Sequence, residues 1–142
     1  MLDAITRMPT VLVIEDNLQA ADSLALFLRY SGYEVRVAHN GAQALEAARL
    51  RSPDAVLCDI RLPDMDGFAV AGQLRAQLGS RALLIAVTAY AGADFAERAR
   101  AAGFDRSFAK PLDPFELERL IQAHEEKRTV RTEHKEPDER GA

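Results

Sequence analysis

Polar side chains that could do chemistry follow four apolar runs of this sequence. Glu15 and Asp16 follow VLVI, Asp59 follows AVLC, Thr88 follows LLIAV, and Lys110 follows SFA. Parallel strands bury both faces and are open only at their carboxyl ends, so residues that end such strands meet at one edge of the sheet. We therefore expect these five side chains to converge on one crevice.

The carboxylates of Glu15, Asp16 and Asp59 would repel one another in such a crevice unless a positive charge compensates them. A divalent cation is the natural partner. The donors are all oxygens, which favours a hard ion, so Mg²⁺ is the first candidate and Mn²⁺ the second. The alternative is that each residue only caps a helix or lies in a loop.

Lys110 and Thr88 add an ammonium and a hydroxyl at two further strand ends, and a metal site alone does not need them. A phosphoryl group does, because its transfer depends on positioning and on neutralising the charge of its oxygens. Asp59 is the candidate nucleophile, since aspartate can form an acyl phosphate and this residue lies centrally. Taken singly, Thr88 and Lys110 also suit surface or capping roles; only the combination indicates a phosphoryl site.

Strand-like apolar runs alternate with segments of helical period, which predicts repeated βα units and a parallel sheet. Five units in one chain indicate an α/β, flavodoxin-like, doubly wound (βα)5 fold with a five-stranded sheet in the order 2-1-3-4-5. The order reverses between strands one and three, where ligands bind in such sheets. The predicted strands are 11–15, 34–38, 55–59, 83–87 and 105–109, and the predicted helices are 17–31, 40–50, 66–78, 91–102 and a last one from 114.

Two of these helices have informative sequences. The last has a clear start, because Asp113 can cap it, Pro114 suits its first position and Glu116 completes a D-x-x-E box. The helix at 91–102 has only Phe95, Ala99 and Ala102 on its apolar side, so we expect it to be the least firmly docked.

Length and composition restrict the class of protein. With 142 residues, 48% of them hydrophobic, the chain suits one domain, and a net charge of -4 does not favour nucleic acid or an anionic membrane as partner. The single cysteine, Cys58, and the lack of a targeting or membrane-spanning segment fit a cytoplasmic protein. We expect an N-terminal extension at 1–9, a domain at 10–125, and a charged, disordered tail at 126–142.

The segments VLVIEDN, DIRLPDMDGF, VTAY and FAKPLDPFEL, in this order and at these intervals, resemble the receiver domain of two-component response regulators. The resemblance covers about residues 10–125. It implies that Asp59 accepts a phosphoryl group from a phosphohistidine, carried by a sensor histidine kinase or a histidine phosphotransfer protein. The reaction would depend on magnesium, and the phosphorylated protein would signal to a downstream protein or pass the group on.

The resemblance also implies a ligand set for the metal. Asp16 and Asp59 would bind Mg²⁺ together with the backbone carbonyl of Arg61. Glu15 would act mostly through water.

Further roles follow from the same resemblance. Thr88 would hydrogen-bond a phosphoryl oxygen, Lys110 would pair with Asp59 or its phosphate, and the Lys110–Pro111 peptide bond would be cis, which proline makes accessible. Phosphorylation would draw Thr88 and Lys110 inward and shift the helix at 91–102. The face formed by that helix, the last strand and the last helix would contact a partner or a second copy of the chain.

One position departs from the family. Receivers usually carry an aromatic residue or histidine three residues before the lysine, as a rotameric switch, and here that residue is Ser107. Phe104 and Phe108 lie nearby, and Tyr90 is a candidate substitute. Arg61 and Tyr90 would also overhang the route by which water reaches the acyl phosphate.

The sequence carries no recognisable output module after Ala123, so we expect a stand-alone receiver and not an enzyme. Two alternatives remain: a magnesium-dependent phosphatase with an aspartate nucleophile, and a pseudo-receiver held in one state as a protein-binding module. Arg61 occupies the position of the general acid in such phosphatases, which disfavours the first. The intact set of site residues disfavours the second, and no P-loop motif is present.

Overall fold

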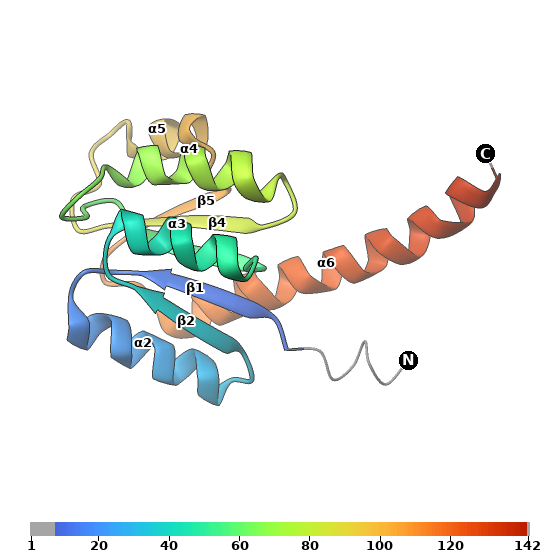
Figure 1. Ribbon diagram of the computed structural model, residues 1–142, viewed down its shortest axis with the longest axis horizontal. Helices are drawn as coiled ribbons and strands as arrows, with labels where there is room; N and C mark the ends of the chain where they lie inside the picture. Colours follow the sequence, from blue (N-terminus) through green and yellow to red (C-terminus); the bar gives the residue numbers. More distant parts are fainter. Residues whose placement is uncertain (1–7, 142) are drawn as a thin grey trace.

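The computed structural model describes residues 8–141, with side chains described as far as Arg128. The predicted extension at 1–9 therefore lies almost entirely outside the described residues. Five parallel strands form one sheet in the order β2-β1-β3-β4-β5, as predicted (Figure 1). The strands are β1 (Thr10–Ile14), β2 (Glu34–Ala38), β3 (Ala55–Asp59), β4 (Leu83–Thr88) and β5 (Arg106–Ala109).

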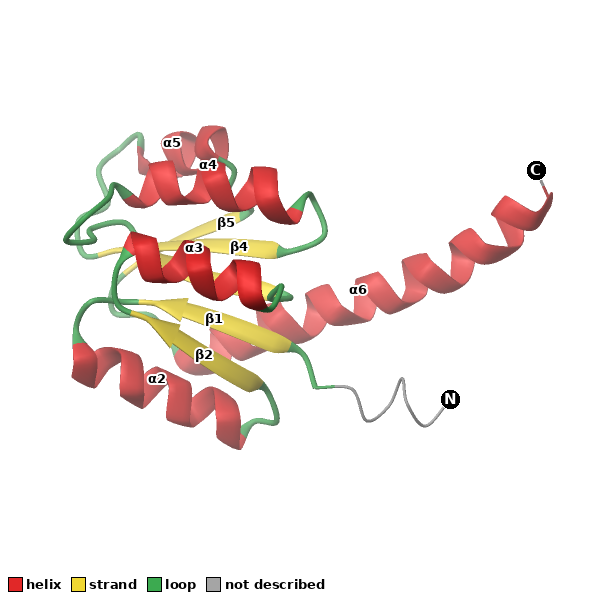
Figure 2. Ribbon diagram, in the orientation of Figure 1, coloured by secondary structure: helices red, strands yellow, loops and turns green. Residues whose placement is uncertain are grey.

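Helices cover both faces of the sheet (Figure 2). One face packs against α2 and α6, and the other against α3, α4 and α5. Alternate residues of each central strand point to opposite faces, so both cores are built from the same strands. The helices are α2 (Leu18–Tyr30), α3 (Gly41–Leu50), α4 (Gly67–Leu78), α5 (Phe95–Ala102) and α6 (Pro114–Gly141).

The central strands are buried along their whole length, whereas the edge strands are not. All residues of β1, β3 and β4 are buried, which explains their continuous apolar sequences. β2 buries only Val35 and Ala38, and β5 is partly exposed, because these strands form the two edges. Cys58 lies within β3 as a buried free thiol.

The strand register aligns the carboxyl ends that carry the polar residues. Ile14 pairs with Cys58, and each is followed in the chain by an acid, Glu15 and Asp59. Thr88 pairs with Ala109 at the end of β5. Asp59 pairs with Val87, one residue before Thr88.

Two predicted boundaries differ from the structure. Helix α5 begins at Phe95 and not at residue 91, because Phe95 donates its backbone N–H to the carbonyl of Gly92 in a turn that precedes the helix. The short α5 buries only Phe95 and Ala99 among its eight residues, and the predicted inward residue Ala102 is only partly buried. This agrees with the expected weak docking.

At the other end, α6 continues to Gly141 where a disordered tail was predicted from 126. Its first part is anchored, because Arg128 donates to the buried Asp54 carboxylate over 2.7 Å. The Glu, Lys and Arg residues beyond 125 have high helix propensity, so the backbone can stay helical without an apolar face to bury. Figure 1 shows this part of α6 running past the edge of the sheet.

None of the described helices combines the length and the apolar sequence that a membrane-spanning segment needs.

Candidate functional site

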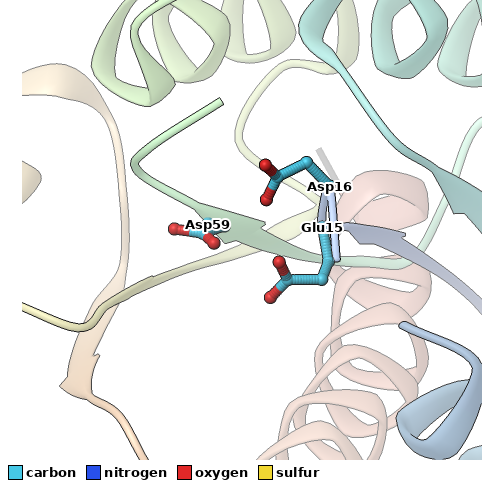
Figure 3. A group of neighbouring side chains, drawn as sticks. All are labelled: Glu15, Asp16 and Asp59. Carbon is cyan, nitrogen blue, oxygen red and sulfur yellow. The ribbon is translucent and has the colours of Figure 1, made fainter. Parts of the chain in front are cut away.

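Three acidic side chains meet at the carboxyl ends of β1 and β3, as the sequence predicts. One oxygen from each of Glu15, Asp16 and Asp59 lies within 4.8 Å of the others. Figure 3 shows their carboxylates around a common space, with Glu15 and Asp16 reaching from the end of β1 toward Asp59 on β3. Glu15 and Asp59 are buried, whereas Asp16 is exposed. The site thus has two fixed acids and one at its solvent side.

Lys110 joins this cluster from the end of β5. Its Nζ donates to Oε1 of Glu15 over 2.8 Å and to Oδ2 of Asp59 over 2.9 Å. The lysine side chain is 34% exposed, against 11% for Glu15 and 9% for Asp59. Burial raises the pKa of Glu15, and the hydrogen bond from Lys110 opposes that rise without cancelling it. Burial acts to lower the pKa of Lys110, but the hydrogen bonds to both carboxylates and their negative charges together outweigh burial and raise the pKa.

Backbone donors fix the remaining oxygens of the two buried acids. Oε2 of Glu15 accepts from the backbone N–H of Asn17 over 3.0 Å, and Oδ1 of Asp59 accepts from that of Arg61 over 3.0 Å. Asn17 also caps α2 by accepting from the N–H of Ala20. The start of α2 and the loop after β3 therefore hold the carboxylates in place.

The loop after β3 is itself clamped by contacts that the sequence analysis did not identify. Asp64 accepts from the backbone N–H of Gly41 over 2.7 Å and from that of Ala42 over 3.0 Å, at the start of α3. A Cβ atom on Gly41 would come within 2.6 Å of the sulfur of Met65, so the neighbouring residue packs directly on the helix start. Asp64 and Met65 both lie in the segment DIRLPDMDGF, which carries the family resemblance, but only the tertiary structure shows what they contact.

Gly67 explains how α4 can begin so close to the end of β3. A Cβ atom at this position would lie 2.6 Å from Cα of Ile60 and 2.9 Å from the carbonyl oxygen of Asp59. The backbone N–H of Gly67 donates to the carbonyl of Ile60, and the backbones of Arg61 and Asp66 pair in an isolated antiparallel β-bridge. The backbone carbonyl of Arg61, the predicted main-chain ligand of the metal, thus belongs to a tight turn between β3 and α4.

Thr88 is buried at the end of β4, the strand next to β3. Its Oγ1 accepts from the backbone N–H of Tyr90 over 3.2 Å and lies 3.5 Å from the carbonyl of the same residue. The hydroxyl therefore bonds with its own loop. It stands one strand away from Asp59, where an added group could reach it.

The donor set fits a hard divalent cation. Three carboxylates face one ammonium, which leaves the cluster with excess negative charge, and all its side-chain donors are oxygens. Asp16 is exposed, so a cation held here would keep solvent access and room for waters and for a phosphoryl oxygen. Mg²⁺ suits this arrangement because it prefers one or two carboxylates together with water and phosphate ligands.

This geometry is found in a chain whose sequence matches a known protein family. Residues 11–122 match the model of the response regulator receiver domain. The chain therefore belongs to the response regulator receiver domain family. Receivers in general bind Mg²⁺ through an acidic pocket, and the cluster of Glu15, Asp16 and Asp59 is the corresponding acidic group here.

Sequence relatives of this receiver differ in length. An uncharacterized 14.6 kDa protein from the sodA1 3′ region of Leptolyngbya boryana is 36% identical over 115 residues, covering 80% of this chain and 88% of that protein. The transcriptional regulatory protein PdtaR of Mycobacterium tuberculosis is 37% identical over 81% of this chain and 54% of its own. ZraR of Escherichia coli O157:H7 is also 37% identical, but over only 25% of its length. The chain thus spans about half or less of these two regulators.

Solved structures agree with the receiver fold. A CheY-like receiver domain from Methanospirillum hungatei superposes with a TM-score of 0.82 at 26% identity, over 88% of this chain and 99% of that one. The chemotaxis protein CheY4 of Vibrio cholerae gives a TM-score of 0.77 at 25% identity, over 82% and 98%.

The predicted switch residues of this receiver lie on two sides of α5. Tyr90 is 81% exposed in the loop after Thr88 and lines a cavity of about 440 Å³ with Phe68 and Phe95. Ser107, at the position usually held by an aromatic residue, lines a second cavity of about 200 Å³.

The other two predicted switch residues border the lysine on the same strand and turn. Phe108 is partly buried against the core on the α2 and α6 face, so it does not point toward the cavity beside Ser107. The Lys110–Pro111 peptide bond is cis, as the family resemblance implies.

Proposed function

We propose that this receiver accepts a phosphoryl group on Asp59 from the phosphohistidine of a sensor histidine kinase or a histidine phosphotransfer protein. The observation that carries this proposal is the contact of the Asp59 carboxylate with Lys110, beside the two acids that end β1. A nucleophilic carboxylate, an ammonium and a candidate cation site within one crevice are the parts that phosphoryl transfer needs.

Magnesium would be held by Asp16, Asp59 and the backbone carbonyl of Arg61, with Glu15 acting through water. Mn²⁺ would be able to take the place of Mg²⁺. Bound there, the ion would neutralise the charge of the phosphoryl oxygens during transfer. The excess of carboxylates over ammonium groups supports this assignment.

The side chains of the site would divide the remaining work. An oxygen of Asp59 forms a bond to phosphorus while the bond from phosphorus to the imidazole nitrogen of the donor breaks, and the imidazole leaves with the electron pair and takes up a proton. Lys110 already contacts Asp59, so its ammonium is in place to pair with a phosphoryl oxygen. Thr88 would exchange its bonds within the loop for one to the phosphoryl group.

Such an exchange would transmit the signal to α5. The loop at 89–94 joins Thr88 to this helix, which has only eight residues and buries only Phe95 and Ala99. A shift of the loop would therefore move α5 and reshape the face that it forms with β5 and α6. A downstream protein, or a second copy of the chain, would recognise that face in the cytoplasm.

The protein would act as a phosphoryl acceptor and not as a turnover enzyme. An aspartate-nucleophile phosphatase places a second aspartate two residues after the nucleophile as general acid, and this chain has Arg61 there. Its guanidinium stays protonated and cannot serve as a proton donor at neutral pH.

The proposal is tested by incubating the protein with Mg²⁺ and acetyl phosphate and measuring the intact mass. We expect a base-labile gain of one phosphoryl group that is absent in Asp59→Asn and abolished by EDTA. Asp54→Asn is not a suitable control, since Asp54 is buried in an ion pair, whereas the exposed Asp22→Asn should behave like the wild type. An equal mass gain in Asp59→Asn would overturn the proposal.

A further inference from the structure

A cavity of about 530 Å³ lies beside the phosphoacceptor, between α2 and the segment 110–114. Its walls come from strand residues, from the inner side of α2 and from the residues after Lys110. Most of them are apolar, among them Val13, Leu57, Val87, Leu24, Phe27 and Leu112. Ala20 and Ser23 of α2 line it as well, and both are exposed, so the cavity opens to solvent.

We propose that this cavity binds a small organic cation: a molecule with an apolar body, such as an aromatic ring on a short alkyl chain, and one ammonium group. The volume lies within the range of natural small-molecule sites, which combine apolar walls with a few convergent polar groups. The exposed rim at Ala20 provides the entrance.

The polar groups of the cavity lie together and select the sign of the ligand. Glu15, Asp59 and Lys110 all line it, and they form one connected group through the two hydrogen bonds of the ammonium. Two carboxylates and one ammonium leave a net charge of one negative unit, which the neighbouring carboxylate of Asp16 increases. A cationic head can bond the carboxylates, which are low in exposure and therefore poorly screened.

An anionic head would meet the opposite situation. It could approach Lys110, but that nitrogen lies 2.8 and 2.9 Å from carboxylate oxygens that would repel the anion. Only a divalent cation at the acids would reverse this preference. Binding of the organic cation therefore requires only the cavity and its charges, whereas its effect on phosphoryl acceptance rests on the proposed function.

The two occupants would compete for the same carboxylates. Because coupling between two binding sites is reciprocal, an ammonium ligand that weakens Mg²⁺ binding must itself be weakened by Mg²⁺. The cavity would thus make phosphoryl acceptance sensitive to organic cations.

The test measures binding of 3-phenylpropylammonium to the full chain in metal-free buffer containing EDTA. Binding is followed by the change in the NMR chemical shifts of the backbone amides. We expect saturable shifts at Leu24, Phe27 and Leu112, and a dissociation constant about tenfold lower than for 3-phenylpropanoate or 3-phenylpropan-1-ol. Equal affinity for the three probes would overturn the cationic class, and no binding by any of them would overturn the site.

Two variants test whether the probe binds in this cavity. Ala20→Phe and Ser23→Phe fill the rim of the cavity and should each weaken binding of the ammonium probe at least about tenfold. Ala76→Phe, on the exposed side of α4, is the matched control and should bind like the wild type. Unchanged affinity in both rim variants, with unfolding curves showing that they are folded, would overturn the assignment.

A final arm separates this inference from the proposed function. Binding of the ammonium probe in EDTA, combined with no mass gain from acetyl phosphate, would contradict only the proposed function. Normal phosphorylation with no probe binding would contradict only the cation site.

Discussion

Nζ of Lys110 lies 2.8 Å from Oε1 of Glu15, although 95 positions separate the two residues in the sequence. The same nitrogen donates to Asp59, so the ends of β1, β3 and β5 are joined through one ammonium. Two buried carboxylates thus depend on a single compensating charge. Removing this ammonium should therefore make burial of the two carboxylates less favourable.

Lys110→Met should destabilise the protein by about 1–2 kcal/mol at pH 7, a value reduced from that of a fully buried pair because the lysine is partly exposed. The hydrogen bond from Lys110 lowers the pKa of Glu15, so its loss should raise that pKa further above the ordinary 4.5. A raised folded-state pKa means that the stability present below 4.5 is lost as pH rises through the folded pKa. The deficit of the variant should therefore be larger at pH 7 than at pH 4.5.

Urea unfolding at the two pH values measures this difference. Lys127→Met on α6, which removes an exposed lysine, is the control and should cost little at either pH. A deficit of the same size at both pH values would mean that Glu15 does not depend on Lys110.

Asp16→Asn should stabilise the metal-free protein slightly, by about 1 kcal/mol or less, because it removes one of three carboxylates from a cluster with one ammonium. It should also abolish most of the gain in melting temperature that Mg²⁺ gives the wild type, since ligand binding to the folded state stabilises it. Thermal unfolding with and without MgCl₂ measures both effects, with the exposed Asp22→Asn as control. A full magnesium response in Asp16→Asn would exclude this residue as a ligand.

Asp64→Ala should lower the melting temperature and weaken Mg²⁺ binding, because two hydrogen bonds then no longer tie the loop after β3 to the start of α3. Asp64→Asn keeps one acceptor oxygen, so its melting temperature and Mg²⁺ affinity should lie between those of the wild type and of Asp64→Ala. Those bonds hold the pKa of Asp64 below its usual 3.8, so its stabilising effect should be present above 3.8 and be lost as pH falls through the lower folded-state pKa. The idea fails if Asp64→Ala binds Mg²⁺ as tightly as the wild type in calorimetry.

The sequence predicted the strand ends well because each is a break in polarity. A buried parallel strand needs a continuous apolar run, so the first charged residue after VLVI or AVLC had to lie at its open end. That rule placed Asp59 and Lys110 at the same edge of the sheet, and the family resemblance implied that the two side chains pair. Local signals also fixed the start of α6 at Pro114, since Asp113 caps it by accepting from Phe115.

Long-range contacts left no such trace. Asp54 looks like an ordinary loop acid, yet it is buried and accepts from the backbone of Thr10 and from Arg128, 74 residues away. The contact of Asp64 with Gly41 is likewise invisible to periodicity, because it joins a loop to the start of a helix. The extent of α6 was underestimated because a charged helix without an apolar stripe has the same composition as a disordered tail.

Tyr90→Ala should abolish a partner's preference for the phosphorylated protein while leaving phosphorylation intact. The ring is exposed beside a cavity lined by Phe68 and Phe95, which offers it a place once Thr88 moves, and Ser107 supplies no ring of its own. The measurement compares binding of a partner, once captured with the phosphorylated protein, to both forms of wild type and variant. An unchanged preference would assign the switch elsewhere.

Reduction with borohydride locates the phosphoryl group, since it converts an aspartyl phosphate to homoserine. After treatment with acetyl phosphate and Mg²⁺, peptide mass mapping should find homoserine at position 59, and none after treatment without Mg²⁺. Homoserine at 15, 16 or another acid instead of 59, or none at all, would contradict the assignment of Asp59 as the phosphoryl acceptor.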